Sequence, residues 1–222
     1  MASLPTIAGL KSILHKIIEL GILPKSAYLA GGTALYFYFN HRQSIDLDFF
    51  CPETFRSEYL AARFRDIFDI AEVEILQEDT LILHLGEQRT KFSLFRLPYT
   101  LLKPVELRQI KEGTYCPIAS LDDIAAMKAV AVVQRGTAKD FIDLHRLLFE
   151  TGFSFSQLAA LVKTKYRLGE EYEYHLKTAL VYFDDAEPDV RSIILLGKGE
   201  HPRPPTAKEW NAVREFFLGF DR

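Results

Sequence analysis

The stretch from Tyr28 to Phe50, YLAGGTALYFYFNHRQSIDLDFF, constrains the fold more than any other part of the sequence. A short apolar run, Ala27 to Ala30, ends at Gly31-Gly32 and is typical of a buried strand. Thr33 to Asn40 predicts a short helix, and Ile45 to Phe50 alternates apolar and acidic residues with the period of two that a strand requires. A strand, a glycine turn, a helix and a second strand are therefore expected in immediate succession.

The second strand of this unit carries two acids. Asp46 and Asp48 occupy positions i and i+2, so they face the same side of a sheet. Neighbouring carboxylates repel each other unless a cation lies between them, and Mg²⁺ is commonly held by one or two carboxylates together with substrate phosphates. Gly31 and Gly32 allow a backbone to approach a ligand closely, and a helix starting near Thr33 offers free N–H groups to a phosphate. An acidic strand face and a tight turn each have a structural explanation on their own; their combination favours a nucleotide site with a metal.

The rest of the first half predicts further helices and strands. Thr6 to Leu20 and Arg56 to Phe68 have the apolar spacing of amphipathic helices. Three strands are expected, with Gly86-Glu87 as the turn between the last two: Glu72 to Gln77, Leu81 to Leu85 and Thr90 to Phe95.

The sequence beyond about residue 118 is mostly helical in pattern. Ser120 followed by Asp123 resembles a helix-start box. Residues 184–205 are polar and contain several prolines, which predicts loops, and a final helix is expected over Ala207 to Leu218. We therefore expect an α+β fold with an α/β core over residues 1–118 and a helical region over 119–222 that completes the cleft. The other helices are predicted over Leu121 to Gln134, Ala138 to Phe149, Ser154 to Tyr166 and Glu171 to Phe183.

Composition excludes several classes of protein. A net charge of −3 excludes a protein that coats nucleic acid along its whole surface. The two cysteines are too few for a disulfide framework and indicate buried thiols in a reducing compartment. No secretory signal is visible, and the longest uncharged run, Ser26 to Asn40, is shorter than a membrane span. We expect a cytoplasmic protein without a membrane segment.

Two segments resemble a known family. A Gly-Gly turn, a short helix and a strand with Asp-x-Asp are similar to the signature of the polymerase-β-like nucleotidyltransferase superfamily. More narrowly, GGTALYFYFNHRQSIDLDFF resembles the AbiEii/AbiGii group of bacterial nucleotidyltransferase toxins, with matches at Gly31 to Leu35, His41-Arg42, Ser44 and Asp46 to Phe50. The downstream segment SLDDIAAMKAVAVVQRGTAKDFIDLHRLL adds matches at Lys128, Arg135, Lys139-Asp140 and Asp143-Leu144. Together these segments span roughly Tyr28 to Leu148, and the tail from about Phe153 onward is not matched to the group.

This resemblance implies a polymerase-β-like core with a mixed sheet and a Mg²⁺-dependent transfer of a nucleotide from an NTP to an acceptor hydroxyl. It implies a toxin of an abortive-infection toxin–antitoxin pair, with an antitoxin protein as partner and a tRNA 3′ end as acceptor. Asp46 and Asp48 would hold the metal. The implied catalytic residues are Asp46, Asp48, Lys128, Asp140 and Asp143, and the implied nucleotide-binding residues are Gly31, Gly32, Thr33, Arg42, Ser44, Lys128, Arg135 and Lys139.

Several of these residues also have simpler interpretations. Lys128 interrupts an apolar helix, so its amine could reach water while its stem lies on the core. Arg42 could be a solvated loop residue, and Lys139 with Asp143 has the i, i+4 spacing of a surface ion pair. Two loose groups of basic residues give weak support for RNA binding but also suit a solvated surface: Lys163, Lys165, Arg167 and Lys177 on the helical part, and Arg191, Lys198 and Arg203 in the loop.

One departure from the superfamily pattern opens an alternative function. Many of its members carry a third carboxylate on a later strand. The candidate strand here, Thr90 to Phe95, has Ser93 at the position where that acid is expected. Asp140 or Asp143 could fill the gap from the helical side. Alternatively, the chain is a catalytically weak nucleotide-binding module that acts through a partner protein.

Overall fold

The computed structural model describes residues 6–69, 71–197 and 201–220, and the chain divides into two compact units. The first unit holds the described residues up to Phe37 together with Ser44–Thr100 and Val105–Ala119. The second holds Tyr38–Gln43, Leu101–Pro104 and the described residues from Ser120 onward. A sheet with its covering helices forms the first unit, and helices form the second.

The first unit is built on one seven-stranded sheet in the order β3-β4-β5-β2-β1-β7-β6. The pairs β2–β5 and β1–β7 are parallel, and the other neighbouring strands are antiparallel, so the sheet is mixed. The strands are β1 (Tyr28–Leu29), β2 (Leu47–Cys51), β3 (Ala71–Gln77), β4 (Thr80–Leu85), β5 (Thr90–Arg96), β6 (Glu106–Lys111) and β7 (Thr114–Ile118).

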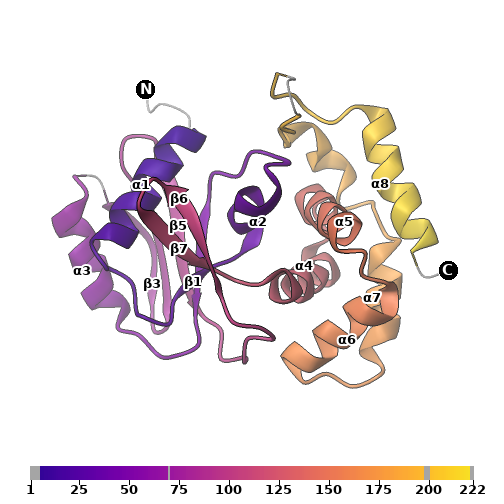
Figure 1. The fold of residues 1–222 in the computed structure, drawn as a ribbon, viewed down its shortest axis with the longest axis horizontal. Helices are drawn as coiled ribbons and strands as arrows, with labels where there is room; N and C mark the ends of the chain where they lie inside the picture. Colours follow the sequence, from indigo (N-terminus) through magenta and orange to yellow (C-terminus); the bar gives the residue numbers. More distant parts are fainter. Residues whose placement is uncertain (1–5, 70, 198–200, 221–222) are drawn as a thin grey trace. The chain divides into compact units, whose positions relative to one another are not determined.

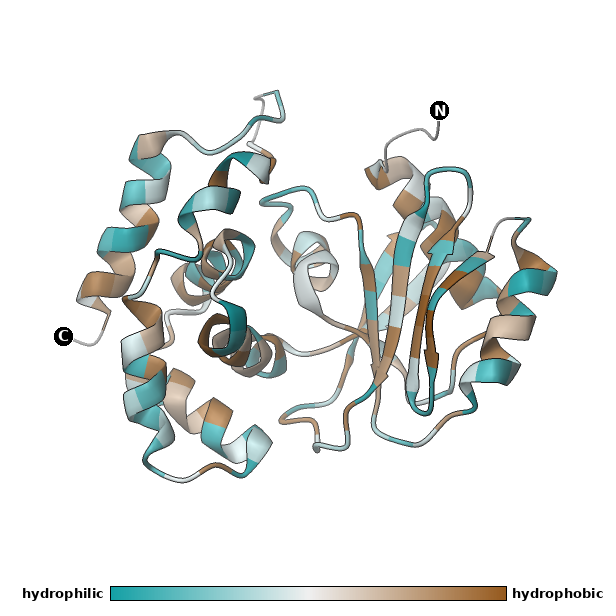
Figure 2. Cartoon of the chain, turned by 180° about the vertical axis from the view of Figure 1, so that it is seen from behind, coloured by the Kyte–Doolittle hydropathy of each residue, from teal (hydrophilic) through white to brown (hydrophobic). Residues whose placement is uncertain are grey.

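Helices cover both faces of this sheet. In both views α1 (Ile7–Glu19) and α3 (Ser57–Ile67) lie on one face and α2 (Gly31–Phe39) on the other (Figures 1 and 2). Many residues of the strands are apolar, as the colouring of Figure 2 shows. Phe64 of α3 packs on Phe92 of β5 with ring centroids 4.6 Å apart, and Phe49 of β2 lies 5.8 Å from Phe92. The core beneath α1 and α3 thus fixes which side of β2 is left for polar residues.

The hairpin β6–β7 was not among the predicted strands. The edge strand β6 is largely exposed, with Leu107 69% accessible, so it lacks the alternation of buried apolar residues that marks a strand. Pro117 in β7 further weakens the pattern, because proline cannot donate to a ladder. The two strands pair from Glu106↔Ile118 to Lys111↔Thr114, and only this pairing makes them recognisable.

The second unit contains the predicted helices and confirms the helical C-terminal region. Ser120 Oγ accepts a hydrogen bond from Asp123 N, as the helix-start box predicts. Complete capping boxes start α6 and α8, at Ser154 with Gln157 and at Thr206 with Glu209. The helices are α4 (Leu121–Arg135), α5 (Ala138–Thr151), α6 (Phe155–Tyr166), α7 (Tyr172–Leu180), the 3-10 helix η1 (Glu187–Ser192) and α8 (Ala207–Gly219).

Two expectations from composition can be compared with the structure. Cys51 and Cys116 are both buried and free, and burial raises the pKa of Cys116 to about 12, so the Cys116 thiol is not set up for chemistry. No helix among the described residues is long and apolar enough to cross a membrane.

Candidate functional site

The glycine turn and the acidic strand meet in the first unit. Gly31 begins α2 with a φ of +69°, in the left-handed region that favours glycine. A Cβ placed on Gly31 would lie 3.1 Å from Asp48 Oδ2. Ala30 N also donates to the backbone oxygen of Asp48 at 3.0 Å. The backbone at the start of α2 therefore lies directly against one of the two predicted metal ligands.

Asp46 and Asp48 lie at the beginning of β2. The strand begins at Leu47, so Asp46 immediately precedes it. The prediction that Asp46 lies within the strand was therefore wrong by one residue. The burial alternation nevertheless starts at Asp46: both acids are half-buried, while Leu47 and Phe49 are fully buried. This period of two puts both acids on the sheet face that does not carry Leu47 and Phe49.

Thr33 and Ser44 hold the segment that carries Asp46. Both side chains are buried, and Thr33 Oγ1 lies 2.9 Å from Ser44 Oγ. Thr33 Oγ1 also donates to the backbone oxygen of Asp46 at 2.5 Å. The two hydroxyls are therefore engaged inside the protein, and the groups that the first turn of α2 can offer to an anion are its backbone N–H groups.

The position expected to carry a third acid is occupied by Ser93. The parallel pairing of β2 with β5 sets Asp48 opposite Ser93, which is buried. Among residues 6–69, 71–197 and 201–220, no group of three or more His, Cys, Asp or Glu side chains could hold a metal ion. Two half-exposed carboxylates beside a close backbone approach still fit Mg²⁺, which takes hard oxygen ligands and completes its octahedron with waters and phosphates.

The second unit gathers the downstream motif around Asp143. This carboxylate on α5 is completely buried and accepts two hydrogen bonds from Arg42, from Nε and Nη2, both at 2.7 Å. Lys128 Nζ lies 2.7 Å and His41 Nε2 2.8 Å from it. Burial alone would raise the pKa of Asp143, but the charges of Arg42 and Lys128 and the bond from His41 hold that pKa well below 3.8.

Asp140 is the second buried acid of this cluster. Lys128 Nζ donates to it at 3.0 Å, Arg135 Nε at 2.8 Å and the Thr137 hydroxyl at 2.6 Å. Burial opposes ionisation, yet the bond from Arg135 and the charge of Lys128 keep the pKa of Asp140 well below its ordinary value. The amine of Lys128 is thus buried between two carboxylates and does not extend into water.

The cluster carries an excess of positive charge. Arg42, Lys128 and Arg135 oppose two carboxylates, and burial lowers the pKa of His41 despite its bond to Asp143, so the imidazole adds no charge near neutral pH. The Arg135 side chain is 54% exposed. A positive group at the surface, backed by a buried paired network, is suited to binding an anion such as phosphate.

Several simpler interpretations do not fit this geometry. Arg42 is buried against Asp143 rather than solvated. Lys139 is exposed, while the partners of Asp143 that the structure describes are His41, Arg42 and Lys128, so the i, i+4 surface pair is not formed.

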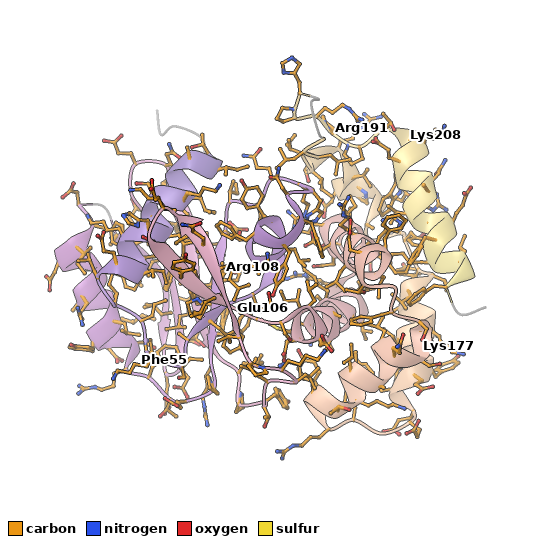
Figure 3. The ribbon with its side chains drawn as sticks, in the orientation of Figure 1. Phe55, Glu106, Arg108, Lys177, Arg191 and Lys208 are labelled. Carbon is orange, nitrogen blue, oxygen red and sulfur yellow. The ribbon has the colours of Figure 1, made fainter. Side chains whose placement is uncertain are left out.

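The two groups of basic residues proposed for RNA are only partly available to it. Lys165 is completely buried and pairs with Asp123 at 2.7 Å, so it is unavailable to RNA. Lys163 pairs with Glu170 and Glu173. Figure 3 shows Lys177 of the helical group and Arg191 of the loop group at opposite ends of the second unit, as two separate groups require. Lys198 lies outside the described residues. Sequence reasoning missed the Lys165–Asp123 pair, although Lys165 lies three residues from Val162 on the apolar side of its helix.

Comparisons with known proteins give this geometry a context. A family model described as "Nucleotidyl transferase AbiEii toxin, Type IV TA system" matches residues 12–222. An uncharacterized protein of Aquifex aeolicus (strain VF5) is 38% identical over 208 residues, 93% of this chain and 91% of that protein.

Two solved structures share the fold. The nucleotidyltransferase toxin MenT4 from Mycobacterium tuberculosis H37Rv matches with a TM-score of 0.61 and 18% identity, covering 96% of this chain and 83% of that one. A putative nucleotidyltransferase from H. pylori matches with a TM-score of 0.54 and 18% identity, covering 97% and 91% respectively.

Proposed function

Because the chain belongs to the AbiEii family of nucleotidyltransferase toxins, we propose that it transfers a nucleotide from an NTP to an acceptor hydroxyl with the help of Mg²⁺ held by Asp46 and Asp48. The family and the fold make it a nucleotidyltransferase of a toxin–antitoxin system and bear out the resemblance seen in the sequence. The metal, the NTP and the acceptor are the proposed part.

The contact between Gly31 and Asp48 is the observation that carries the proposal. The backbone at the start of α2 lies where a Cβ would meet Asp48 Oδ2 at 3.1 Å. A phosphate bound by the N–H groups of Gly32 and Thr33 would therefore lie close to the Asp48 carboxylate. Two anions so close need a cation between them, which supports a metal–triphosphate complex at this position.

Each site residue of the first unit then has a defined role. The N–H groups of α2 bind phosphate oxygens, and the buried hydroxyls of Thr33 and Ser44 keep the Asp46 backbone in place. The bound ion would neutralise charge on the triphosphate and orient the α-phosphate. Asp46 and Asp48 hold that ion as hard oxygen ligands.

In the second unit, we assign the excess positive charge to phosphate binding. Lys128 and Arg135 supply that charge, and the exposed Lys139 adds to it. Asp140 and Asp143 have low pKa values and all of their oxygens are engaged, so they are poor proton acceptors. We therefore propose them as positioning residues that orient Lys128, Arg135 and Arg42, and not as the base that activates the acceptor.

The test is transfer from labelled nucleotides. The protein is incubated with each α-labelled NTP, Mg²⁺ and total RNA, and the products are separated on a gel. Asp46→Asn and Asp48→Asn should each abolish transfer without unfolding the chain, because they remove charge and keep shape. Asp66→Asn, on the exposed side of α3, is the matched control and should transfer normally. Full activity in the double Asp46/Asp48 variant would reject the assignment.

The same assay separates the enzyme from the alternative. Ser93 opposite Asp48 favours a binding module, since it leaves the activation of the acceptor hydroxyl without an evident base. Calorimetry that detects Mg²⁺-dependent NTP binding, together with an absence of transfer to any RNA, supports the module. Labelling of the tRNA fraction supports the tRNA 3′ end as acceptor, and rescue of growth by the product of a neighbouring gene identifies the antitoxin.

A further inference from the structure

The second unit contains a cavity that the proposed reaction does not use. Its volume is about 390 Å³, within the range of small-molecule sites. It lies against α5 and α8, which pack side by side (Figure 1), and against Leu195–Gly197, Arg203 and Pro205. Every lining residue belongs to the second unit.

Three side chains that line this cavity each carry a buried polar atom with no hydrogen-bond partner among the described residues. These atoms are His41 Nδ1, Arg146 Nε and Trp210 Nε1. Buried polar groups are nearly always hydrogen-bonded, because an unsatisfied one costs free energy. Three such atoms around one cavity therefore indicate a ligand that would satisfy them after small side-chain rotations, which are common on binding.

The three atoms define the chemistry of that ligand. His41 Nε2 lies 2.8 Å from Asp143 Oδ1, and a carboxylate only accepts, so the neutral ring carries its proton on Nε2. His41 Nδ1 is then an acceptor, whereas Arg146 Nε and Trp210 Nε1 are donors. The ligand must present donors and acceptors together, as the edge of a nucleobase does.

The remaining walls suit a flat ring. Ile142, Leu195 and Leu196 supply apolar surface, and Phe149 lines the cavity with 70% of its surface exposed. An exposed aromatic side chain beside apolar walls is a stacking platform of the kind that binds bases.

We propose that this cavity binds a nucleobase, an inference that rests on the proposed function for its choice among heteroaromatic rings. The base could belong to a free nucleotide or to an unstacked nucleotide of an RNA, since both present the same ring. The contact of His41 with Asp143 would connect an occupied cavity to the cationic cluster through a single hydrogen bond.

Trp210 is the single tryptophan of the chain and lines the cavity, so all tryptophan emission comes from a side chain of this site. The full chain is titrated with adenosine, guanosine, cytidine or uridine in the presence of EDTA, and in parallel with short single-stranded RNAs. Nucleosides carry no phosphate and EDTA removes the metal, so the phosphate and metal contacts of the proposed catalytic site are excluded. We expect a saturable change in Trp210 emission with at least one base.

Two variants test whether that change arises in the cavity. Ala212→Leu adds bulk at an exposed lining position of α8, and Ala207→Leu is the matched control at an exposed position of the same helix outside the lining. The first should abolish the response and the second preserve it. Phe149→Ala should weaken the affinity about fivefold or more, as expected for the loss of a base-stacking platform. All three positions are exposed, so the fold should survive, and circular dichroism checks this.

The outcomes distinguish a free nucleotide from an RNA as the source of the base, and they distinguish this inference from the proposed transferase function. Saturation by nucleosides supports a free nucleotide, and saturation by RNA alone supports an unstacked base. An absent response to both, or a response that survives Ala212→Leu and Phe149→Ala, overturns the inference. A protein that transfers nucleotides without any Trp210 response loses this inference only, whereas one that binds nucleosides but transfers nothing loses the proposed function only.

Discussion

Gly31→Ala tests the contact on which the proposed function depends. Gly31 has a φ of +69°, and the added methyl would lie 3.1 Å from Asp48 Oδ2, 3.6 Å from its Cβ and 3.8 Å from its Cγ. Gly152, at the end of α5, has the same φ of +69° and nothing within 4 Å of the methyl. The pair of variants therefore imposes the same backbone strain, and only one of them disturbs the carboxylate.

The expected magnitudes follow from this geometry. The left-handed conformation costs an alanine about 1–2 kcal/mol at both positions. At Gly31 the carboxylate must also move by a few tenths of an ångström, and shifts in the support of a metal ligand typically cost about 10- to 100-fold in affinity or activity. We expect similar losses of stability in Gly31→Ala and Gly152→Ala, with a 10- to 100-fold loss of transfer in the first alone.

Urea unfolding and the rate of label transfer are measured side by side. Any excess destabilisation of Gly31→Ala should disappear in an Asp48→Ala background, because that change removes the oxygen that the methyl meets. If Gly31→Ala and Gly152→Ala transfer label equally fast, the glycine turn is only a structural bend and the reasoning fails. If Gly31→Ala is too unstable to assay, Mg²⁺-dependent NTP binding by calorimetry at low temperature takes the place of the rate.

The remaining predictions concern the buried charges. Asp143→Asn leaves buried cations without a counter-charge and should cost about 3–5 kcal/mol of unfolding free energy. Glu150→Gln breaks a surface ion pair on the same helix and should cost about 1 kcal/mol or less. Equal losses of the two variants in urea unfolding would contradict the argument from burial. Acid should destabilise the chain in two steps. Below pH 6.5 the unfolded chain takes up a proton at His41, whereas the folded chain, in which the pKa of His41 is lowered, does not. Below pH 3.8 the same difference arises at Asp143, so the unfolding free energy falls in both pH ranges. A His41→Gln variant should lack the fall below pH 6.5, and an unchanged pH profile in that variant would contradict the assignment of this fall to His41. Lys165→Met strands the buried Asp123 carboxylate and should cost about 3 kcal/mol, measured by thermal melting, whereas a near-neutral result would mean that the bonds from Leu102 and Lys103 suffice.

Local patterns predicted most of the fold. The helices of both units follow from the apolar spacing of their own residues, and their caps, such as Ser120 with Asp123, involve neighbours in the sequence. The turn at Gly31 and the two acids at the start of β2 could likewise be predicted from the sequence, because close backbone approach and strand period are local properties. The edge hairpin was not, since β6 buries little and is defined by its pairing with β7.

The cationic cluster shows where local reasoning ends. The sequence marks Lys128 as a charge in an apolar helix, but the same pattern is expected for a lysine whose amine reaches water. What decides between the two is Asp143, fifteen residues away, together with Arg42, which is 101 residues from Asp143 in the chain. A buried charge persists only when partners with good geometry surround it, and that geometry is a product of the tertiary fold. The same limit applies to the cavity near Trp210, whose three unpartnered atoms come from the loop after α2, from α5 and from α8. Local patterns therefore identify the residues able to do chemistry, whereas the assignment of each to binding, positioning or structure requires the contacts that long-range folding creates.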